Sequence, residues 1–274
     1  MSTSRTSSHT RTTADWISRS IGLLMGVAAL SSSRAYGQDN YEIDVYPSET
    51  VAPKHTMVEL HTNYTLQGTT MPINGAYPTQ DAIHQTLELT HGFSPTFELG
   101  NMNFFSYRTG SEGYQYVGSH LQPRWRVPDN WGWKVGVSLS LEFGYVRPQF
   151  AEDTWTLEIR PIVDKRIGNL YAAFNPILDR SFAGLAAGRG FEFSPSFKVS
   201  YDVTKKITPG FEYYSAVGPV GGFDALSNQQ RQLFVTLNLD VGEDWEFNAG
   251  IGEGFTQSTD HLIVKMIVGR RFSF

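Results

Sequence analysis

Apolar and polar residues alternate along most of the chain from Thr56 onward. In the clearest stretch, 135–145, every odd position is large and apolar, and the even positions hold Gly, Ser or Glu. The same alternation recurs at 191–203 and 233–241. A period of two places the two sets on opposite faces of a β-strand, and no helical period of 3.6 competes in these windows. The pattern therefore predicts an all-β protein.

Turn-forming clusters divide this alternating region into twelve predicted strands. The predicted strands are 56–66, 82–92, 96–107, 116–127, 132–146, 154–164, 169–177, 190–203, 207–216, 230–241, 245–255 and 261–274. The short connections are expected at 92–95, 128–131, 165–168, 204–206 and 242–244, and the long ones at 67–81, 108–115, 178–189 and 217–229. Alternating short and long connections are typical of membrane barrels, whereas a Greek-key sandwich has no reason to keep this order.

These features predict a transmembrane antiparallel up-and-down β-barrel of about 12 strands over residues 56–274. The predicted strands have 9–15 residues, and a tilted strand needs about 9–11 residues to cross the hydrocarbon. Ten strands is the alternative count, and a secreted soluble β-sandwich that folds without detergent is the alternative fold. Twelve strands enclose a lumen between those of eight-stranded barrels and 16-stranded porins. We expect a narrow pore, or one partly plugged by a loop or by segment 38–55, which is assigned to the periplasm.

The first forty residues have a different pattern. Three arginines precede the apolar stretch 21–30, and the small residues Ala35 and Gly37 follow it. This order predicts a secretory signal peptide over residues 1–37, cleaved from the mature chain. Ten apolar residues are too few to cross about 30 Å of hydrocarbon as a helix. Removing this leader, which holds four Arg and one Asp, changes the net charge from −5 to −8. An acidic mature chain argues against a nucleic-acid partner.

Composition supports the same fold class. The 274 residues include no cysteine, so disulfides and thiolate metal sites are excluded. Aromatic residues make up 14% of the chain, 26 residues are glycine, and the mean hydropathy is −0.28. The mature chain contains no apolar run of about 18 residues, which a transmembrane helix would require. Strands with only one apolar face explain the moderate hydropathy.

Large aromatic residues gather near the ends of the predicted strands. Those beside short turns or toward the long loops are predicted to lie at the two membrane interfaces, as aromatic belts do. The interface residues predicted in this way are Trp125, Trp131, Trp133, Tyr145, Trp155 and Trp245. The alternative is that they are ordinary core aromatics.

The last predicted strand ends the chain on Phe274. The parity that directs Val264 and Met266 outward also directs Phe272 and Phe274 outward. A terminal strand ending on an outward aromatic residue is similar to the signal that the barrel-insertion machinery recognises. We therefore predict that Phe274 is an insertion signal.

The inward-facing parity set is rich in ionisable residues. The predicted lumen-lining residues are Glu88, Glu98, Arg124, Arg126, Glu142, Glu158, Arg160, Glu192, Lys198, Asp202 and Glu212, with Lys134 on the same parity. One hypothesis is that they guide a small polar or anionic solute. The other is that they form Glu–Arg pairs that brace the wall, and the proximity of Glu142 to Glu158 and Arg160 on neighbouring strands favours some bracing.

No catalytic or metal-binding motif emerges from the sequence. Ser119 and His120 are adjacent, but neighbours on a strand point to opposite faces. Ser258 and His261 share a short loop in which Asp260 is the one acid. The histidines lack a local metal-ligand spacing. We therefore predict no enzyme activity, no metal site and no cofactor.

The region from about residue 41 to the C-terminus resembles a bacterial barrel family described as putative transporters of the meta-pathway of phenol degradation. Segment 42–47 (EIDVYP), segment 58–64 (VELHTNY), the Gly/aromatic hairpins and the closing Phe274 carry the resemblance. It implies an outer-membrane barrel with passive transport, and it supplies no binding or catalytic residues.

The leading functional hypothesis is an outer-membrane channel for passive uptake of small solutes, with aromatic or hydrophobic compounds as one option. Its expected partners are outer-membrane lipid, the barrel-insertion machinery and an unidentified small-molecule solute. A non-conducting barrel that acts through loops 67–81, 178–189 and 217–229 is the first alternative, and a lipid-modifying barrel enzyme is the second.

Overall fold

A computed structural model describes residues 40–109, 113–242 and 244–273. The predicted signal peptide, residues 1–37, and the predicted insertion signal, Phe274, lie outside the described residues. The strands are β1 (His55–Gln67), β2 (Ile83–Ser94), β3 (Phe97–Arg108), β4 (Gly113–Arg126), β5 (Gly136–Val146), β6 (Asp153–Ile167), β7 (Leu170–Asn175), β8 (Leu178–Gly184), β9 (Phe191–Phe193), β10 (Ser196–Tyr201), β11 (Ile207–Ala216), β12 (Gly218–Pro219), β13 (Gln230–Leu239), β14 (Trp245–Gly254) and β15 (Leu262–Ser273). A short 3₁₀ helix, η1 (Asp129–Trp131), lies between β4 and β5. Among the described residues, no helix is long and apolar enough to cross a membrane.

Fifteen strand segments form a closed barrel of 12 strands, because three strands are each interrupted once. β7 and β8 both pair with β6, on its two halves. The next strand is likewise divided, into β9 and β10, and the strand after it is divided into β11 and β12. Pro176 and Pro195 occupy two of the interruptions, where a residue without an N–H cannot donate to the ladder. Each strand nevertheless continues in the same direction beyond its break.

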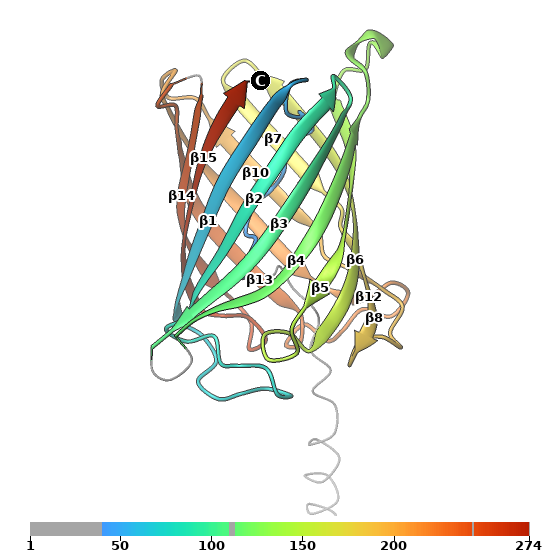
Figure 1. Ribbon diagram of the computed structural model, residues 1–274, viewed down its shortest axis with the longest axis vertical. Coiled ribbons are helices and arrows are strands. Elements are labelled where there is room, and N and C mark those ends of the chain that lie inside the picture. Colours follow the sequence, from blue (N-terminus) through green and yellow to red (C-terminus); the bar gives the residue numbers. More distant parts are fainter. Residues whose placement is uncertain (1–39, 110–112, 243, 274) are drawn as a thin grey trace, which may run out of the picture. The chain divides into compact units, whose positions relative to one another are not determined.

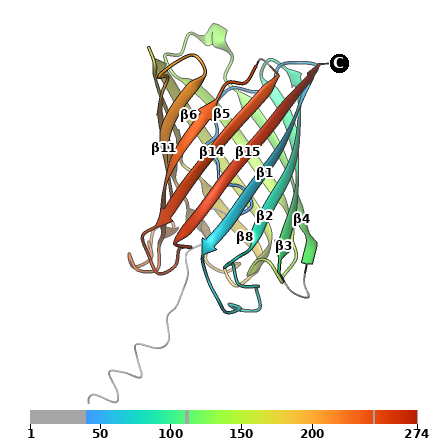
Figure 2. The same cartoon turned by 90° about the vertical axis from the view of Figure 1, so that its left-hand side faces the viewer.

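Pairing between β1 and β15 closes the barrel. Their register runs from His55 opposite Ser273 to Gln67 opposite Leu262, and every strand pair is antiparallel. Figures 1 and 2 show the tilted strands around a common axis. The structure confirms the predicted all-β, antiparallel, twelve-stranded barrel, and the alternative count of ten strands is wrong.

Three connections differ from the predicted pattern of short and long loops. β3 runs to Arg108 and β4 begins at Gly113, so the predicted long loop 108–115 is reduced to the connection 109–112. The predicted loop 178–189 is largely strand β8, so the connection that remains is 185–190. The predicted short turn near 128–131 extends over 127–135, because Gly132 takes a left-handed φ of 70° after η1 and β5 begins only at Gly136. We call the end of the barrel with this connection the short-turn end. The opposite end, with loops 68–82, 147–152, 185–190, 220–229 and 255–261, is the long-loop end.

The outer face of the barrel is apolar around its girth. Exposed residues at mid-strand positions are large and apolar: Leu60, Leu89, Leu121, Leu139, Phe143, Val163, Phe174, Phe211, Val235, Ile251 and Val264. Exposing such a continuous apolar band to water is unfavourable, whereas contact with hydrocarbon is favourable. The closed barrel also leaves no unpaired strand edge in the bilayer. The apolar residues therefore face lipid, which a soluble sandwich would not require.

Aromatic residues flank this apolar band at both ends. All six predicted interface aromatics are exposed on the outside, which excludes a role in a barrel core: Trp125, Trp131, Trp133, Tyr145, Trp155 and Trp245. At the short-turn end, Trp125 packs on Phe97, with ring centroids 5.2 Å apart. At the long-loop end, Trp155 packs on Tyr145 at 5.2 Å. This arrangement matches the aromatic girdles of membrane barrels.

Residues 40–54 lie inside the barrel, and we call this segment the lumen strap. It begins at Asn40, near the long-loop end, where the Asn40 side chain donates to Asp260 (2.6 Å). It ends near the short-turn end, where Lys54 N donates to the carbonyl oxygen of Gly92 (2.9 Å) before β1 begins. The strap is drawn in blue within the barrel in Figures 1 and 2. From the sequence, segment 38–55 was assigned to the periplasm and was also one candidate for a plug of the pore. The described part of that segment crosses the lumen, in line with the second of these expectations.

Candidate functional site

Apolar side chains of the lumen strap pack on opposite walls of the barrel. Tyr41 and Tyr46 join a buried cluster with Met102, Phe104, Val117, Val146 and Ile162. Ile43 and Val45 join a second cluster on the opposite wall, with Ala173, Tyr214, Phe234 and Ile263. One short segment therefore packs against both walls of the barrel. The inward face of the barrel is therefore apolar where these four strap side chains pack against it.

Polar wall residues provide hydrogen-bond partners for the strap backbone. The Asn175 side chain accepts from Tyr46 N (2.9 Å) and donates to Tyr46 O (3.1 Å). Lys265 Nζ donates to Ile43 O (2.9 Å), and Thr86 Oγ1 donates to Tyr41 O (2.7 Å). A buried backbone without such partners would lose stability. Much of the polar character of the lumen thus holds the strap in place.

Several predicted lumen residues belong to this support. Arg124 donates to Pro47 O (3.3 Å) and forms an ion pair with Glu98, which in turn accepts from Val51 N (2.5 Å). Both side chains are buried. The Glu98–Arg124 pair thus links β3 to β4 and also contacts the strap. The alternation of residues along β3 and β4 does not reveal the contact with the strap.

A second buried network lies beside the strap on the wall formed by β10, β11 and β15. Glu212 forms ion pairs with Lys198 (2.8 Å) and with Lys265. The hydroxyl of Tyr214 donates to Glu212 Oε2 (2.7 Å). Glu212 and Lys265 are fully buried, so each compensates for the desolvation of the other. Lys265 was not among the predicted lumen residues, although it shares the inward parity of the last strand.

The remaining predicted lumen residues lie at different depths. Arg160 pairs with Glu158 and lies 3.9 Å from Glu42 of the strap. Glu142 contacts His120 (2.5 Å), and Glu192 pairs with Arg189 (2.5 Å). Glu88 lies beside His61 on the inner face. These contacts fit the bracing hypothesis for the charged lumen.

Arg126 and Asp202 lie at the rim of the short-turn end instead of deep in the lumen. Arg126 pairs with Asp129 of η1 (2.6 Å), and Asp202 pairs with Arg166. Both positions come at or just beyond a strand end, where side chains meet solvent. Lys134 lies in the connection 127–135 and is exposed. Parity alone cannot distinguish a rim position from a deep one.

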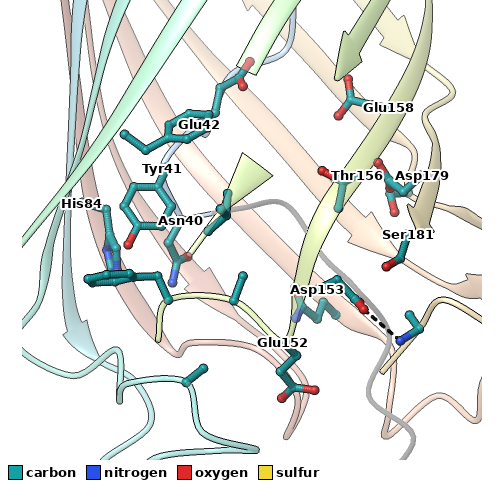
Figure 3. A pocket seen from close by; sticks show the side chains of 18 of the residues that line it. Asn40, Tyr41, Glu42, His84, Glu152, Asp153, Thr156, Glu158, Asp179 and Ser181 are labelled. Carbon is teal, nitrogen blue, oxygen red and sulfur yellow. Dashed lines mark hydrogen bonds between the residues drawn. The ribbon is translucent and has the colours of Figure 1, made fainter. Parts of the chain in front are cut away.

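A cavity of about 320 Å³ opens from the strap toward the long-loop end, and we call it the vestibule. Figure 3 shows Tyr41 and His84 on one side of it, with Glu158 and Asp179 on the other. Its lining combines aromatic rings with ionisable groups in which carboxylates outnumber guanidinium groups: Tyr41, Tyr77, Phe104, Phe150, Arg108, Arg160, Arg180, Glu42, Glu142, Glu152, Asp153, Glu158, Asp179, Glu192 and Asp260.

Asp260 joins the mouth of the vestibule to the strap. Its carboxylate accepts from Thr79 Oγ1 (2.6 Å) and from Asn40 Nδ2 (2.6 Å). Burial raises the pKa of this carboxyl above its usual value of 3.8, although the two hydrogen bonds act in the opposite direction. Asp260 therefore couples two loops of the long-loop end to the start of the strap.

A second cavity, of about 330 Å³, lies on the other side of the strap. It is lined by strap residues such as Asp44 and Pro47 and by Glu59, Lys198 and Asn248 of the wall. Asp240 and Trp245, which flank a short turn, also line it, so this cavity belongs to the short-turn end. The strap thus separates two cavities, one toward each end of the barrel.

The residue pairs considered for catalysis do not form a nucleophile–base arrangement. Ser119 donates to Asn103 (2.7 Å) on the outer side, whereas His120 is buried and contacts Glu142. In the loop 255–261, Ser258 and His261 contact the backbone carbonyls of Ser227 and Gly254 respectively. Neighbouring strand residues point to opposite faces here, as the sequence predicted.

Comparison with solved structures identifies the fold. An outer membrane channel from Pseudomonas putida F1 superimposes with a TM-score of 0.59 at 11% identity, covering 84% of this chain and 100% of that one. The KdgM porin has a TM-score of 0.50 at 11% identity, covering 80% of this chain and 99% of that one. No family model matches the chain, and no curated relative matches it. The fold is that of bacterial outer-membrane β-barrels. With no matching family model or curated relative, the predicted membership of the phenol-pathway family is not confirmed.

Proposed function

We propose that this protein is a passive outer-membrane channel for small solutes, with a passage narrowed by the lumen strap. The two cavities on either side of the strap carry this proposal, because together they provide space, lined by both ionisable and apolar residues, from each end of the barrel toward its middle. The strap lies between them, with Tyr46, Arg160 and Lys265 at its contacts with the walls. The proposal includes the partners expected from the sequence: outer-membrane lipid around the barrel and the insertion machinery that places it there.

The composition of the vestibule supports selection by charge. Carboxylates outnumber guanidinium groups in its lining, so its potential favours cations and neutral solutes over anions. Tyr41, Phe104 and Phe150 add aromatic faces that suit an apolar or aromatic part of a solute. This differs from the anionic solute considered from the parity of charged residues, because many of the cationic side chains are engaged with carboxylates or with the strap.

The test is the reversal potential of single channels in planar bilayers under a KCl gradient. We expect stable current steps with a preference for K⁺. Neutralising two vestibule acids, Glu152→Gln with Asp179→Asn, lowers that preference. Glu253→Gln is the matched control, because it removes one carboxylate from an exposed position of β14 outside the lumen. A preference for Cl⁻, or equal effects of the vestibule and control variants, contradicts the proposed selectivity.

One observation favours a second candidate, a non-conducting barrel. The strap is fixed along its length by wall hydrogen bonds and by two apolar clusters. A permanently seated strap would close the passage and leave the loops of the long-loop end as the binding surface. Complete absence of current from the correctly folded chain, together with current steps from a chain that lacks the strap, would support this candidate over the channel.

A further inference from the structure

Three potential metal ligands converge on the inner wall, away from the vestibule. Glu59 and His61 lie two residues apart on β1 and therefore share its inward face. Glu88 lies directly opposite Glu59 in the pairing of β1 with β2. One ligand atom from each of the three side chains lies within 4.8 Å of the other two. This juxtaposition arises between strands, so the sequence shows no local ligand spacing.

His61 has no conventional partner in this position. It is 2% exposed, and neither ring nitrogen makes a hydrogen bond within the described part of the chain. Its Nε2 lies 3.7 Å from Oε2 of Glu88, which also lacks a hydrogen bond there. This distance is too long for a hydrogen bond but suits two ligands of one ion. A buried imidazole without a partner costs stability, and a bound cation would supply that partner.

Like charges lie face to face at the same place. Glu59 and Glu88 are cross-strand partners, an arrangement that destabilises a sheet when both side chains are ionised. Asp44 of the strap is close enough to interact electrostatically with both Glu59 and His61. The nearby ammonium of Lys265 is already paired with Glu212. A divalent cation would therefore offset the negative charge that the local ion pairs leave uncompensated.

Glu88 is oriented for this role by its neighbour on β2. Thr90 Oγ1 donates to Oε1 of Glu88 (2.6 Å), which leaves Oε2 directed at His61. Hydrogen bonds of this kind commonly fix the ligating carboxylates of metal sites. An ion can also reach the site, because Glu59 and Asp44 both line the cavity at the short-turn end.

We propose that Glu59, His61 and Glu88 bind a first-row divalent transition metal ion, of which Zn²⁺ is the representative. An imidazole with two carboxylates is a donor set that Zn²⁺ accepts, whereas Mg²⁺ and Ca²⁺ prefer oxygen ligands alone. Three protein ligands leave one position for water or for the carboxylate of Asp44. The ion would join β1 to β2 beside the strand pair that closes the barrel.

The test measures metal binding by the detergent-folded full chain after treatment with EDTA. Zn²⁺ is titrated by calorimetry, and Co²⁺ is added separately as a spectroscopic probe whose visible absorption reports its ligand geometry. We expect one ion per chain. His61→Gln and Glu88→Gln each weaken binding more than about a hundredfold, and Thr90→Val, which removes only the orienting hydrogen bond, weakens it by about tenfold to a hundredfold.

His84→Gln is the matched control. His84 is an equally buried inward histidine of the neighbouring strand, and no carboxylate forms an ion pair with it in the described residues. We expect this variant to bind Zn²⁺ like the wild type. Heat-modifiable gel mobility checks that each variant is folded, and Glu59→Gln with Thr90→Val carry the test if His61→Gln does not fold. Absence of Zn²⁺ and Co²⁺ uptake by the wild type, or equal losses in the His84 and His61 variants, overturns the proposal.

Discussion

The substitution Val235→Arg tests whether the apolar face of the barrel contacts lipid. Val235 is 53% exposed on β13. Its cross-strand neighbours are Phe211 on β11 and Ile251 on β14, and both are exposed apolar residues as well. A guanidinium at this position would have no acidic or polar neighbour across either strand pair. It would have to remain in hydrocarbon or distort the surrounding bilayer.

The structure gives the depth of the residue and hence the expected cost. Val235 precedes Leu239, the last residue of β13, by four positions, or about 13 Å along the strand at about 3.3 Å per residue. A strand tilt of about 40° converts this to about 10 Å along the membrane normal. The apolar band is about 25 Å tall, so Val235 lies near its middle. An arginine at that depth costs about 2–4 kcal/mol.

The assay is reversible urea unfolding of the chain refolded into lipid vesicles, followed by tryptophan fluorescence. Val203→Arg is the control, because Val203 is similarly exposed but lies in the short turn after β10, at the interface. There the expected cost is about 0–1 kcal/mol. If the two variants lose the same free energy of unfolding, the apolar face does not meet lipid and the orientation of the barrel wall is wrong.

Three further predictions concern the lumen strap. Lys265→Met leaves the buried carboxylate of Glu212 with one cationic partner and removes a donor to the strap, so we expect a loss of about 3–5 kcal/mol in urea unfolding. Because the pKa of Asp260 is raised in the folded protein, its contribution to stability falls as the pH rises from 3.8 through the shifted value. We expect Asp260→Asn to flatten the dependence of Tm on pH in that window. An unchanged dependence would count against the raised pKa of Asp260. Gly92→Ala places a Cβ 2.2 Å from a strap carbonyl oxygen, so we expect faster proteolysis of the strap, whereas Gly222→Ala, with open space around it, should leave the rate unchanged.

The strand pattern could be predicted because each strand has one face in lipid. That environment demands a large apolar residue at every second position, and the alternation survives even where the strand is irregular. The predicted seventh strand, 169–177, nevertheless ended too early. In the barrel Pro176 removes one ladder hydrogen bond, and β8 continues the strand to Gly184.

Segment 38–55 was one of the segments expected to plug the lumen, but the path of the strap and its contacts could not be predicted. Segment 38–55 has no strand alternation of its own long enough to indicate a membrane span, and its partners lie on six or more distant strands. Lys265 and Asn175 illustrate the difficulty, because their role depends on which strap carbonyl or amide reaches them. The apolar inward residues Phe104 and Phe234 were the available signal, since a water-filled lumen gives no reason for them.

The charged lumen residues were identified by parity, but their roles depend on contacts across the barrel. Glu98 and Arg124 were assigned to the lumen from alternation alone, and the structure adds that they hold the strap. His61 was set aside because it has no local metal-ligand spacing. Its possible co-ligand Glu88 lies on the next strand, a proximity that only the register of β1 and β2 supplies.

The central claim is that the strap narrows a conducting barrel, and single-channel conductance in planar bilayers tests it most directly. The full chain is compared with a variant that lacks residues 40–52, and heat-modifiable mobility establishes that both are folded. Our account predicts small current steps for the full chain and distinctly larger steps for the variant. Equal conductance for the two proteins, or no current from the full chain, would contradict it.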